Sequence, residues 1–225
     1  MKHDFFLLEP SMIAAKWSEF GHEAVRCQEA QIEMLHLDVM DGHFVKNFTM
    51  GPDMVLAIRK TVPDMALDVH LMIYSPEEYI ETFIEAGANE ITFHLEATEE
   101  IAHNLDYIRK CNCKAGLAIR PETSETLLLK YLDQVDKVLI MTVNPGFGGQ
   151  KFMKEMLEKV KFIREKADQE GFKIDIQVDG GINLETCKQA LDAGANLFVS
   201  GTTFFKEKDY TKIHHEFKKL WSPKK

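Results

Sequence analysis

Short apolar runs alternate with longer amphipathic stretches along the whole chain. The apolar runs are bounded by turn residues and are too short for helices, a pattern typical of buried strands. We expect strands at FFLLE near residue 5, MLHLDVM near 34, MALDVHLMI near 65, EITFHL near 90, KAGLAI near 114, KVLIMTV near 137, IDIQVD near 174 and NLFVSG near 196.

The stretches between these runs have apolar residues at helical spacing. Asn183 is a candidate N-cap, and Gly87 and Gly194 are candidate C-caps. We expect helices at SPEEYIETFIEAGA, SETLLLKYLDQV, FMKEMLEKVKFIREKADQEG and NLETCKQALDAGA.

Regular alternation of strands and helices predicts parallel strands joined by crossover helices. Eight such units in this length favour an α/β fold of the (β/α)8 TIM barrel type, with residues 1–225 as one domain. The alternative is a doubly wound open sheet. That fold lacks support because neither G-x-G-x-x-G after the first strand nor G-x-x-x-x-G-K-[ST] occurs in the sequence.

Composition narrows the class of protein and of partner. The net charge of −9 argues against a nucleic-acid partner, since lysine and arginine supply most of that affinity. No apolar run reaches the roughly 20 residues that span a bilayer, and the N-terminal apolar stretch is interrupted by Glu9 and Pro10. The four cysteines form no zinc-binding pattern and are expected to be reduced. We therefore expect a cytoplasmic protein without a membrane partner.

Polar side chains occur near the carboxyl ends of three predicted strands. His36 and Asp38 lie in the second strand, His70 in the third, and Asp179 closes the seventh. Residues i and i+2 of a strand point to the same side, so His36 and Asp38 are expected to face the barrel lumen together. A buried charge is costly unless it is paired or metal-bound, and these strand ends meet at the mouth of a barrel.

Two histidines and two aspartates at one mouth predict a site for one divalent metal such as Zn²⁺ or Fe²⁺. A single histidine or aspartate is more often a hydrogen-bonded core or turn residue. Here three strands place four such side chains at one end of the barrel, which favours a metal site. His94 and Glu96 are interpreted as structural, and His214 and His215 as exposed on the last helix.

Glycine-rich segments follow the sixth, seventh and eighth predicted strands: MTVNPGFGGQKF, VDGGIN and VSGTTFF. Glycines allow backbone N–H groups to approach a ligand, and each segment leads into a helix N-terminus. Because loops after the last strands of this barrel often bind phosphate, we expect an anionic substrate held by backbone dipoles rather than by lysine or arginine. The alternative is that Gly146, Gly148 and Gly149 serve only a tight turn.

Methionines form a third feature near the predicted metal. Met40, Met72 and Met141 each fall near a strand end. Methionine in a strand is usually core packing, but here the three side chains are equally compatible with an apolar cover over a charged intermediate.

Four segments together resemble the ribulose-phosphate 3-epimerase family: HLDVMDGHFVKNFTMGP, DVHLMI, MTVNPGFGGQKF and VDGGIN. The resemblance implies a (β/α)8 barrel in which His36, Asp38, His70 and Asp179 bind one divalent metal per subunit. Zn is the first choice, and Fe, Mn or Co would also fit these ligands. It further implies a homo-oligomer that acts on a phosphorylated ketose, interconverting D-ribulose 5-phosphate and D-xylulose 5-phosphate.

The resemblance also assigns roles to individual residues. Asp38 and Asp179 match the family's two acid/base carboxylates, which transfer protons through an enediolate. Met40, Met72 and Met141 match methionines that shield this intermediate. The residues that match substrate contacts are Ser11, His70, Gly146, Phe147, Gly148, Gly149, Asp179, Gly180, Gly181, Gly201 and Thr202.

Several positions depart from the family pattern. Glu9 replaces a small residue, Lys46 a proline, Arg120 an asparagine or lysine, and Thr202-Thr203 a Ser-Ala pair. Glu9 and Lys46 are expected where the length of a sugar could be measured, so D-allulose 6-phosphate is an alternative substrate. An alternative of another class is a non-catalytic phosphosugar-binding barrel, against which the paired Asp38 and Asp179 argue. A metal-assisted decarboxylase would need a lysine near the metal, which no predicted strand end supplies.

Overall fold

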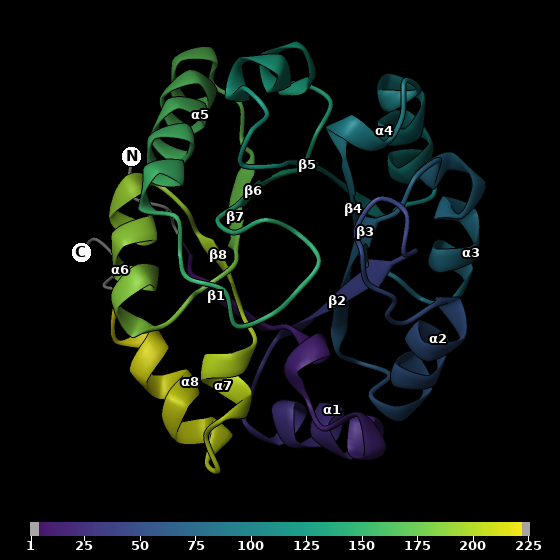
Figure 1. Ribbon diagram of the computed structural model, residues 1–225, viewed down its shortest axis with the longest axis vertical. Helices are drawn as coiled ribbons and strands as arrows, with labels where there is room; N and C mark the ends of the chain where they lie inside the picture. The colour runs from purple at the N-terminus through teal and green to yellow at the C-terminus, as the bar shows by residue number, and fades with distance from the viewer. Residues whose placement is uncertain (1–4, 222–225) are drawn as a thin grey trace.

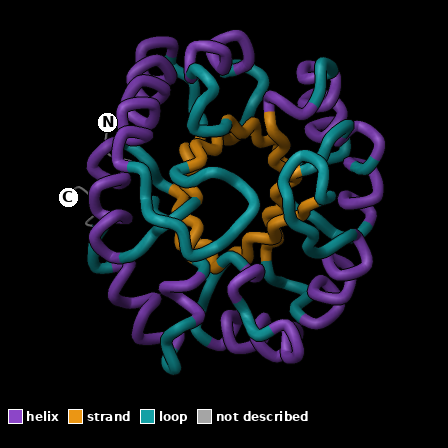
Figure 2. Tube along the Cα trace, viewed as in Figure 1, coloured by secondary structure: helices purple, strands orange, loops and turns teal. Residues whose placement is uncertain are grey.

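The computed structural model describes residues 5–221, so both ends of the predicted domain, residues 1–4 and 222–225, lie outside the described residues. A ring of parallel strands is surrounded by helices (Figure 2). The strands are β1 (Leu7–Pro10), β2 (Met34–Met40), β3 (Ala66–Met72), β4 (Glu90–His94), β5 (Lys114–Ile119), β6 (Lys137–Met141), β7 (Asp175–Asp179) and β8 (Leu197–Ser200).

The order of the strands closes the sheet on itself. All neighbours pair in parallel in the order β1-β8-β7-β6-β5-β4-β3-β2, and a parallel bridge between Ser11 and His36 joins the end of β1 to β2. Every predicted strand is present, and the predicted (β/α)8 barrel is confirmed. A closed barrel also removes the unpaired edges that an open sheet would expose.

Helices connect successive strands on the outside of the ring (Figure 1). The α-helices are α1 (Phe20–Glu29), α2 (Pro52–Thr61), α3 (Ile80–Glu85), α4 (Ile101–Lys110), α5 (Leu157–Glu170), α6 (Leu184–Ala193), α7 (Thr202–Phe205) and α8 (Tyr210–Lys218). The 3-10 helices are η1 (Met12–Ala14), η2 (Trp17–Glu19), η3 (Pro76–Glu78), η4 (Leu95–Ala97), η5 (Glu125–Tyr131) and η6 (Lys154–Met156).

The connection after β5 differs from its prediction. An α-helix was expected at SETLLLKYLDQV, but the structure has the 3-10 helix η5 there. Leu128 and Tyr131 are buried three residues apart, whereas Leu127 and Leu129 are exposed. Residues i and i+3 eclipse in a 3-10 helix, so this geometry buries the first pair together. A run of adjacent leucines does not define an α-helical face.

The caps predicted around α6 are present and fix the turn that leaves β7. The Asn183 side chain accepts hydrogen bonds from the backbone N–H groups of Glu185 and Thr186, and the Thr186 hydroxyl accepts one from the Asn183 N–H. Gly194 ends the helix in the left-handed region at φ 114°. These contacts satisfy backbone groups that a helix end leaves unpaired.

Alternation along β2 places its polar residues in the lumen, as predicted. Leu35, Leu37 and Val39 belong to the main hydrophobic core. The parallel register pairs His36 with Asp68 and Asp38 with His70 on β3. Side chains on the same face of paired strands are neighbours, so the register alone brings both histidines next to carboxylates.

The lumen beneath the mouth is filled with charged and amide side chains. Lys137 on β6 lies with Nζ 2.6 Å from Asp68 Oδ1 and 3.1 Å from Glu90 Oε2, and all three side chains are buried. The Gln177 amide donates to Glu9 Oε2 at 2.6 Å and to Asp68 Oδ2 at 2.7 Å. These residues form a buried polar layer in which each charge has a partner, as low-dielectric surroundings require.

The predicted place of Glu9 was wrong. Its side chain is fully buried on β1, inside this polar layer, and does not line the mouth. Burial raises the pKa of Glu9 to about 8, although the His36 imidazole, with Nδ1 3.8 Å from Glu9 Oε2, opposes this shift. Glu9 therefore packs the lumen and does not measure a substrate.

Two further features bear on predictions from the sequence. None of the helices within residues 5–221 is long and apolar enough to cross a membrane. All four cysteines are free; Cys27, Cys113 and Cys187 are buried, whereas Cys111 is exposed at the end of α4. Burial raises the pKa of Cys113 to about 12, so this thiol stays protonated and unreactive.

Candidate metal and sugar-phosphate site

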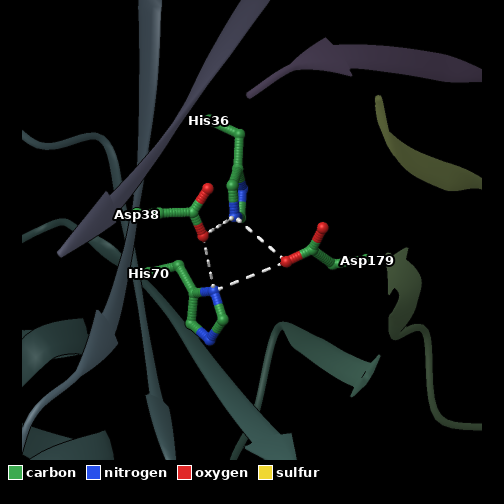
Figure 3. Close-up of side chains that lie close together, drawn as sticks. All are labelled: His36, Asp38, His70 and Asp179. Atoms are coloured by element: carbon green, nitrogen blue, oxygen red, sulfur yellow. Dashed lines mark hydrogen bonds and ion pairs between the residues drawn. The ribbon is translucent and has the colours of Figure 1, made fainter. Parts of the chain in front are cut away.

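Four side chains from β2, β3 and β7 point toward one another at the carboxyl end of the barrel (Figure 3). Asp38 Oδ1 lies 3.3 Å from His36 Nε2 and 3.2 Å from His70 Nδ1. Asp179 Oδ2 lies 4.0 Å from His36 Nε2 and 3.8 Å from His70 Nδ1. The structure thus brings together the four residues predicted as metal ligands.

The donor atoms of this cluster fit a divalent ion. One donor atom from each of the four side chains lies within 4.8 Å of all the others. His36 Nε2 is buried and has no hydrogen-bond partner, because its contact with Asp38 lacks the geometry of a hydrogen bond. A buried polar atom without a partner is costly, and a cation would satisfy it. Imidazole nitrogen and carboxylate oxygen suit Zn²⁺, Fe²⁺, Mn²⁺ or Co²⁺.

The two carboxyl groups have opposite protonation tendencies. Burial raises the pKa of Asp179 to about 7, and the negative charge of Asp38 acts in the same direction. Burial also opposes ionisation of Asp38, but the charge of the nearby His36 imidazole and the hydrogen bond from His70 outweigh it and hold the pKa of Asp38 below its usual value. Two interacting carboxyl groups titrate as a pair, in which one holds a proton while the other is ionised.

The two imidazoles also differ. Burial lowers the pKa of His70 to about 4, so this ring is neutral, which is the form that binds metals. Burial opposes protonation of His36 too, but Asp38 and Asp68 raise its pKa well above the usual value. His36 Nδ1 lies 2.9 Å from Asp68 Oδ2, so that nitrogen is occupied and Nε2 is the one that faces the cluster.

Ser11, at the end of β1, completes the surroundings of Asp38. Its hydroxyl donates to Asp38 Oδ2 at 2.5 Å, whereas Asp38 Oδ1 faces the two histidines. The two oxygens of one carboxylate thus have separate partners. Ser11 orients the carboxyl group and leaves one oxygen directed at the cluster.

A cavity of about 550 Å³ opens above the four-residue cluster. The loop between β6 and α5, which crosses the ring of strands in Figure 1, forms part of its wall. His36 and His70 are buried beneath the cavity surface. The predicted site residues that line it are Ser11, Asp38, Met40, Met72, Met141, Gly146, Phe147, Gly148, Gly149, Asp179, Gly180, Gly181, Gly201 and Thr202.

The cavity also contains groups that the sequence interpretation missed. Lys151 lines it and is exposed, so a cationic side chain is available beside the glycine loops, where only backbone dipoles were expected. Gln150 and Asn183 line it as well. All three lie within or directly beside the predicted glycine-rich segments, and their position there was the available signal.

Two other polar side chains, Asp41 and His214, have partners of their own. Asp41 accepts hydrogen bonds from the backbone N–H groups of His43, Phe44 and Tyr74, so it holds the turn after β2. The prediction that His214 is exposed was wrong, because it is buried with Nδ1 2.9 Å from the Ala30 carbonyl oxygen.

A model of the ribulose-phosphate 3-epimerase family matches residues 7–205, which include every strand and the whole cluster. The chain belongs to this family. It is 42% identical to ribulose-phosphate 3-epimerase of Chlamydia muridarum over 210 residues, with 92% of this chain and 91% of the relative covered. It is 41% identical to ribulose-phosphate 3-epimerase of Bacillus subtilis over 210 residues, covering 93% of this chain and 96% of the relative.

Barrels of low sequence identity share this fold. The crystal structure of 3-keto-L-gulonate-6-phosphate decarboxylase from Vibrio cholerae aligns with a TM-score of 0.71 over 97% of each chain, at 13% identity. That likeness concerns the fold alone. Membership of the ribulose-phosphate 3-epimerase family identifies this chain as an isomerase, a carbohydrate-phosphate 3-epimerase.

Proposed function

We propose that the chain interconverts D-ribulose 5-phosphate and D-xylulose 5-phosphate with one divalent metal, Zn²⁺ first among the candidates. The observation that carries the proposal is the pair of carboxyl groups, Asp38 on β2 and Asp179 on β7, that meet in one cluster with the spacing of metal ligands (Figure 3). The relatives of similar length named above support the pentulose substrate. The homo-oligomeric state and cytoplasmic location stay predictions.

Inversion at carbon 3 needs a base on one face of the sugar and an acid on the other. In one direction the ionised Asp38 removes the proton and the protonated Asp179 delivers another; in the reverse direction the roles exchange. The pKa values of the pair, lowered for Asp38 and raised for Asp179, match this division. A divalent ion held by His36, Asp38, His70 and Asp179 supplies positive charge that stabilises negative charge developing on the sugar oxygens.

The cavity wall provides for the rest of the substrate. Gly146 to Gly149, Gly180, Gly181, Gly201 and Thr202 are proposed to hold the phosphate through backbone N–H groups, with Lys151 adding charge. Met40, Met72 and Met141 are almost fully buried around the mouth and are proposed to exclude water from the charged intermediate.

The positions that raised D-allulose 6-phosphate as an alternative mostly lie elsewhere. Glu9, Lys46 and Arg120 are absent from the cavity wall, and only Thr202 and Thr203 of those departures line it. This favours the pentulose substrate.

Metal removal and substrate comparison test the proposal together. We expect chelation to abolish turnover of D-ribulose 5-phosphate and stoichiometric metal to restore it, because a divalent ion would supply the positive charge that offsets the developing anion. Initial rates are measured for D-ribulose 5-phosphate and D-allulose 6-phosphate before and after chelation. Full turnover without metal would contradict the metal role, and a higher kcat/KM for the hexulose phosphate would contradict the substrate.

Gly181→Ala is expected to raise KM for the sugar phosphate about tenfold, with a smaller effect on kcat. A Cβ at Gly181 would lie 2.7 Å from the backbone nitrogen of Phe152, at a φ of 67° that disfavours side chains. The β6–α5 loop must therefore shift away from the proposed phosphate site. Steady-state kinetics of the variant check this.

Gly171→Ala is the matched control for this substitution. Gly171 caps α5 at a φ of 75°, has open space around its Cβ position and lies outside the cavity. We expect a similar loss of stability in both variants but an unchanged KM in Gly171→Ala. Equal KM values for the two variants would refute the proposed role of the loop.

A further inference from the structure

Two side chains, the buried His94 and the half-buried Glu96, follow His70 in a chain of contacts on the side away from the four-residue cluster. His70 Nε2 lies 2.9 Å from His94 Nε2, and the two rings stack with centroids 5.0 Å apart. His94 Nδ1 lies 3.2 Å from Glu96 Oε2. The sequence interpretation treated His94 and Glu96 as merely structural, but the structure joins them to a proposed metal ligand.

The protons of this chain can be placed from its geometry. His70 Nδ1 faces Asp38 and Asp179, so a cation there requires that nitrogen to be unprotonated. The neutral ring then holds its proton on Nε2 and donates it to His94 Nε2. His94 in turn holds its proton on Nδ1 and donates it to the Glu96 carboxylate.

The electrostatics of the three groups agree with that order. Both imidazoles are fully buried, and burial in low-dielectric surroundings favours their neutral form. Burial opposes ionisation of Glu96, but its hydrogen bonds to His94, to the Thr123 hydroxyl and to the Arg120 backbone N–H lower its pKa to about 2. An ionised carboxylate therefore accepts from a neutral imidazole at the end of the chain.

Glu96 itself is held firmly. Its other oxygen, Oε1, accepts from the Arg120 backbone N–H at 2.8 Å and from the Thr123 hydroxyl. The Arg120 guanidinium lies over the Phe44 ring, which in turn packs against His94 with centroids 4.8 Å apart. The carboxylate and the intervening ring thus have little freedom to move away from His70.

We propose that Glu96 and His94 are positioning residues that fix the tautomer of His70 and strengthen its bond to the divalent cation. His36 has the equivalent support directly from Asp68 at 2.9 Å, whereas His70 receives it through a second imidazole. A carboxylate that accepts the far N–H of a metal-bound imidazole makes the ring a better ligand, and loss of such a partner typically weakens metal binding 10–100-fold. This inference rests on the proposed metal site.

Glu96→Gln tests the charge with little change in shape. We expect its dissociation constant for Zn²⁺, measured on the whole protein by competition with a chelator and without sugar, to rise about 10–100-fold. The matched control is Glu122→Gln, whose exposed carboxylate pairs with the same Arg120 at 3.8 Å, whereas the carboxylate that hydrogen-bonds to His94 is that of Glu96. Its dissociation constant should stay within about twofold of the wild type.

His94→Phe separates an effect that passes through the hydrogen bonds of His94 from a general effect of the Glu96 charge. It keeps an aromatic ring against His70 and Phe44 and leaves the Glu96 charge in place, but removes both nitrogens. We expect weaker Zn²⁺ binding here too, in a sample whose circular dichroism spectrum matches that of the wild type.

The outcomes are distinguishable. If the wild type binds no Zn²⁺, the proposed function itself fails. If the wild type binds and Glu96→Gln matches it within twofold, only the positioning role fails. If Glu96→Gln and Glu122→Gln weaken binding equally, or a folded His94→Phe keeps full affinity, the effect is one of net charge and the positioning role is overturned.

Discussion

Asp38→Asn and Asp179→Asn are each expected to lower kcat about 10³-fold or more for the conversion of D-ribulose 5-phosphate, since each amide can neither remove nor deliver the proton at carbon 3. The side chains keep their size, and a carbonyl oxygen still faces the cluster. Turnover is measured at saturating metal, with the bound metal determined on the same sample. Loss of the ion is thereby separated from loss of the proton-transfer group.

Asp175→Asn is the matched control. Asp175 lies on the same strand as Asp179 but at its other end, where it accepts a hydrogen bond from the Asn196 amide. Its kcat should stay within about twofold of the wild type. Near wild-type turnover by metal-loaded Asp38→Asn and Asp179→Asn would remove both residues from the proposed mechanism.

Isotope exchange gives a second measurement on the same variants. A variant with one remaining carboxyl group can still exchange the carbon 3 proton with solvent deuterium from one face. We therefore expect each variant to label only one of the two epimers, without converting it, and the two variants to label opposite epimers. Equal labelling of both epimers by either variant would contradict a one-acid-per-face mechanism.

Lys137→Met is expected to lower the free energy of unfolding by about 3–5 kcal/mol, because removal of one partner leaves buried charges unpaired. Lys137 is 1% exposed and lies within 2.6 Å of Asp68 and 3.1 Å of Glu90, both also buried. Methionine fills a similar volume but cannot neutralise either carboxylate. Urea denaturation followed by circular dichroism measures the change.

Lys114→Met provides the comparison on the same carboxylate. Lys114 pairs with Glu90 at 2.8 Å, but its side chain is 57% exposed, so water screens the pair. We expect a loss of less than about 1 kcal/mol. A loss as large as that of Lys137→Met, or an unaffected Lys137→Met, would show that the lumen tolerates an unpaired charge.

The sequence was sufficient for the barrel and for the residues gathered at its mouth. Short apolar runs that alternate with amphipathic helices are typical of buried parallel strands. The period-two alternation of side chains along such a strand places His36 and Asp38 on one face. The carboxyl ends of parallel strands must meet, so Asp179 could be predicted to approach residues more than a hundred positions away.

Other features depend on contacts that no local pattern encodes. The sequence pattern predicts Glu9 at the mouth, near the end of its strand, yet its contacts with Gln177 and His36 place it in the lumen. His94 and Glu96 carry no local signal of a role at the site, because the contact that joins them to it is with His70 on the adjacent strand. The 3-10 geometry of η5 depends on which of its adjacent leucines pack against the barrel, and the sequence does not distinguish them.

The position of β1 between β8 and β2 has a consequence for biogenesis. Ser11 and His36 form the bridge that closes the ring, but β1 pairs with the last strand of the chain, so closure must wait until residues near 200 leave the ribosome. Contacts this distant in sequence form slowly. Binding of a divalent ion at the proposed site is therefore expected late, when synthesis is nearly complete, because until then His36 and His70 lack the closed barrel around them.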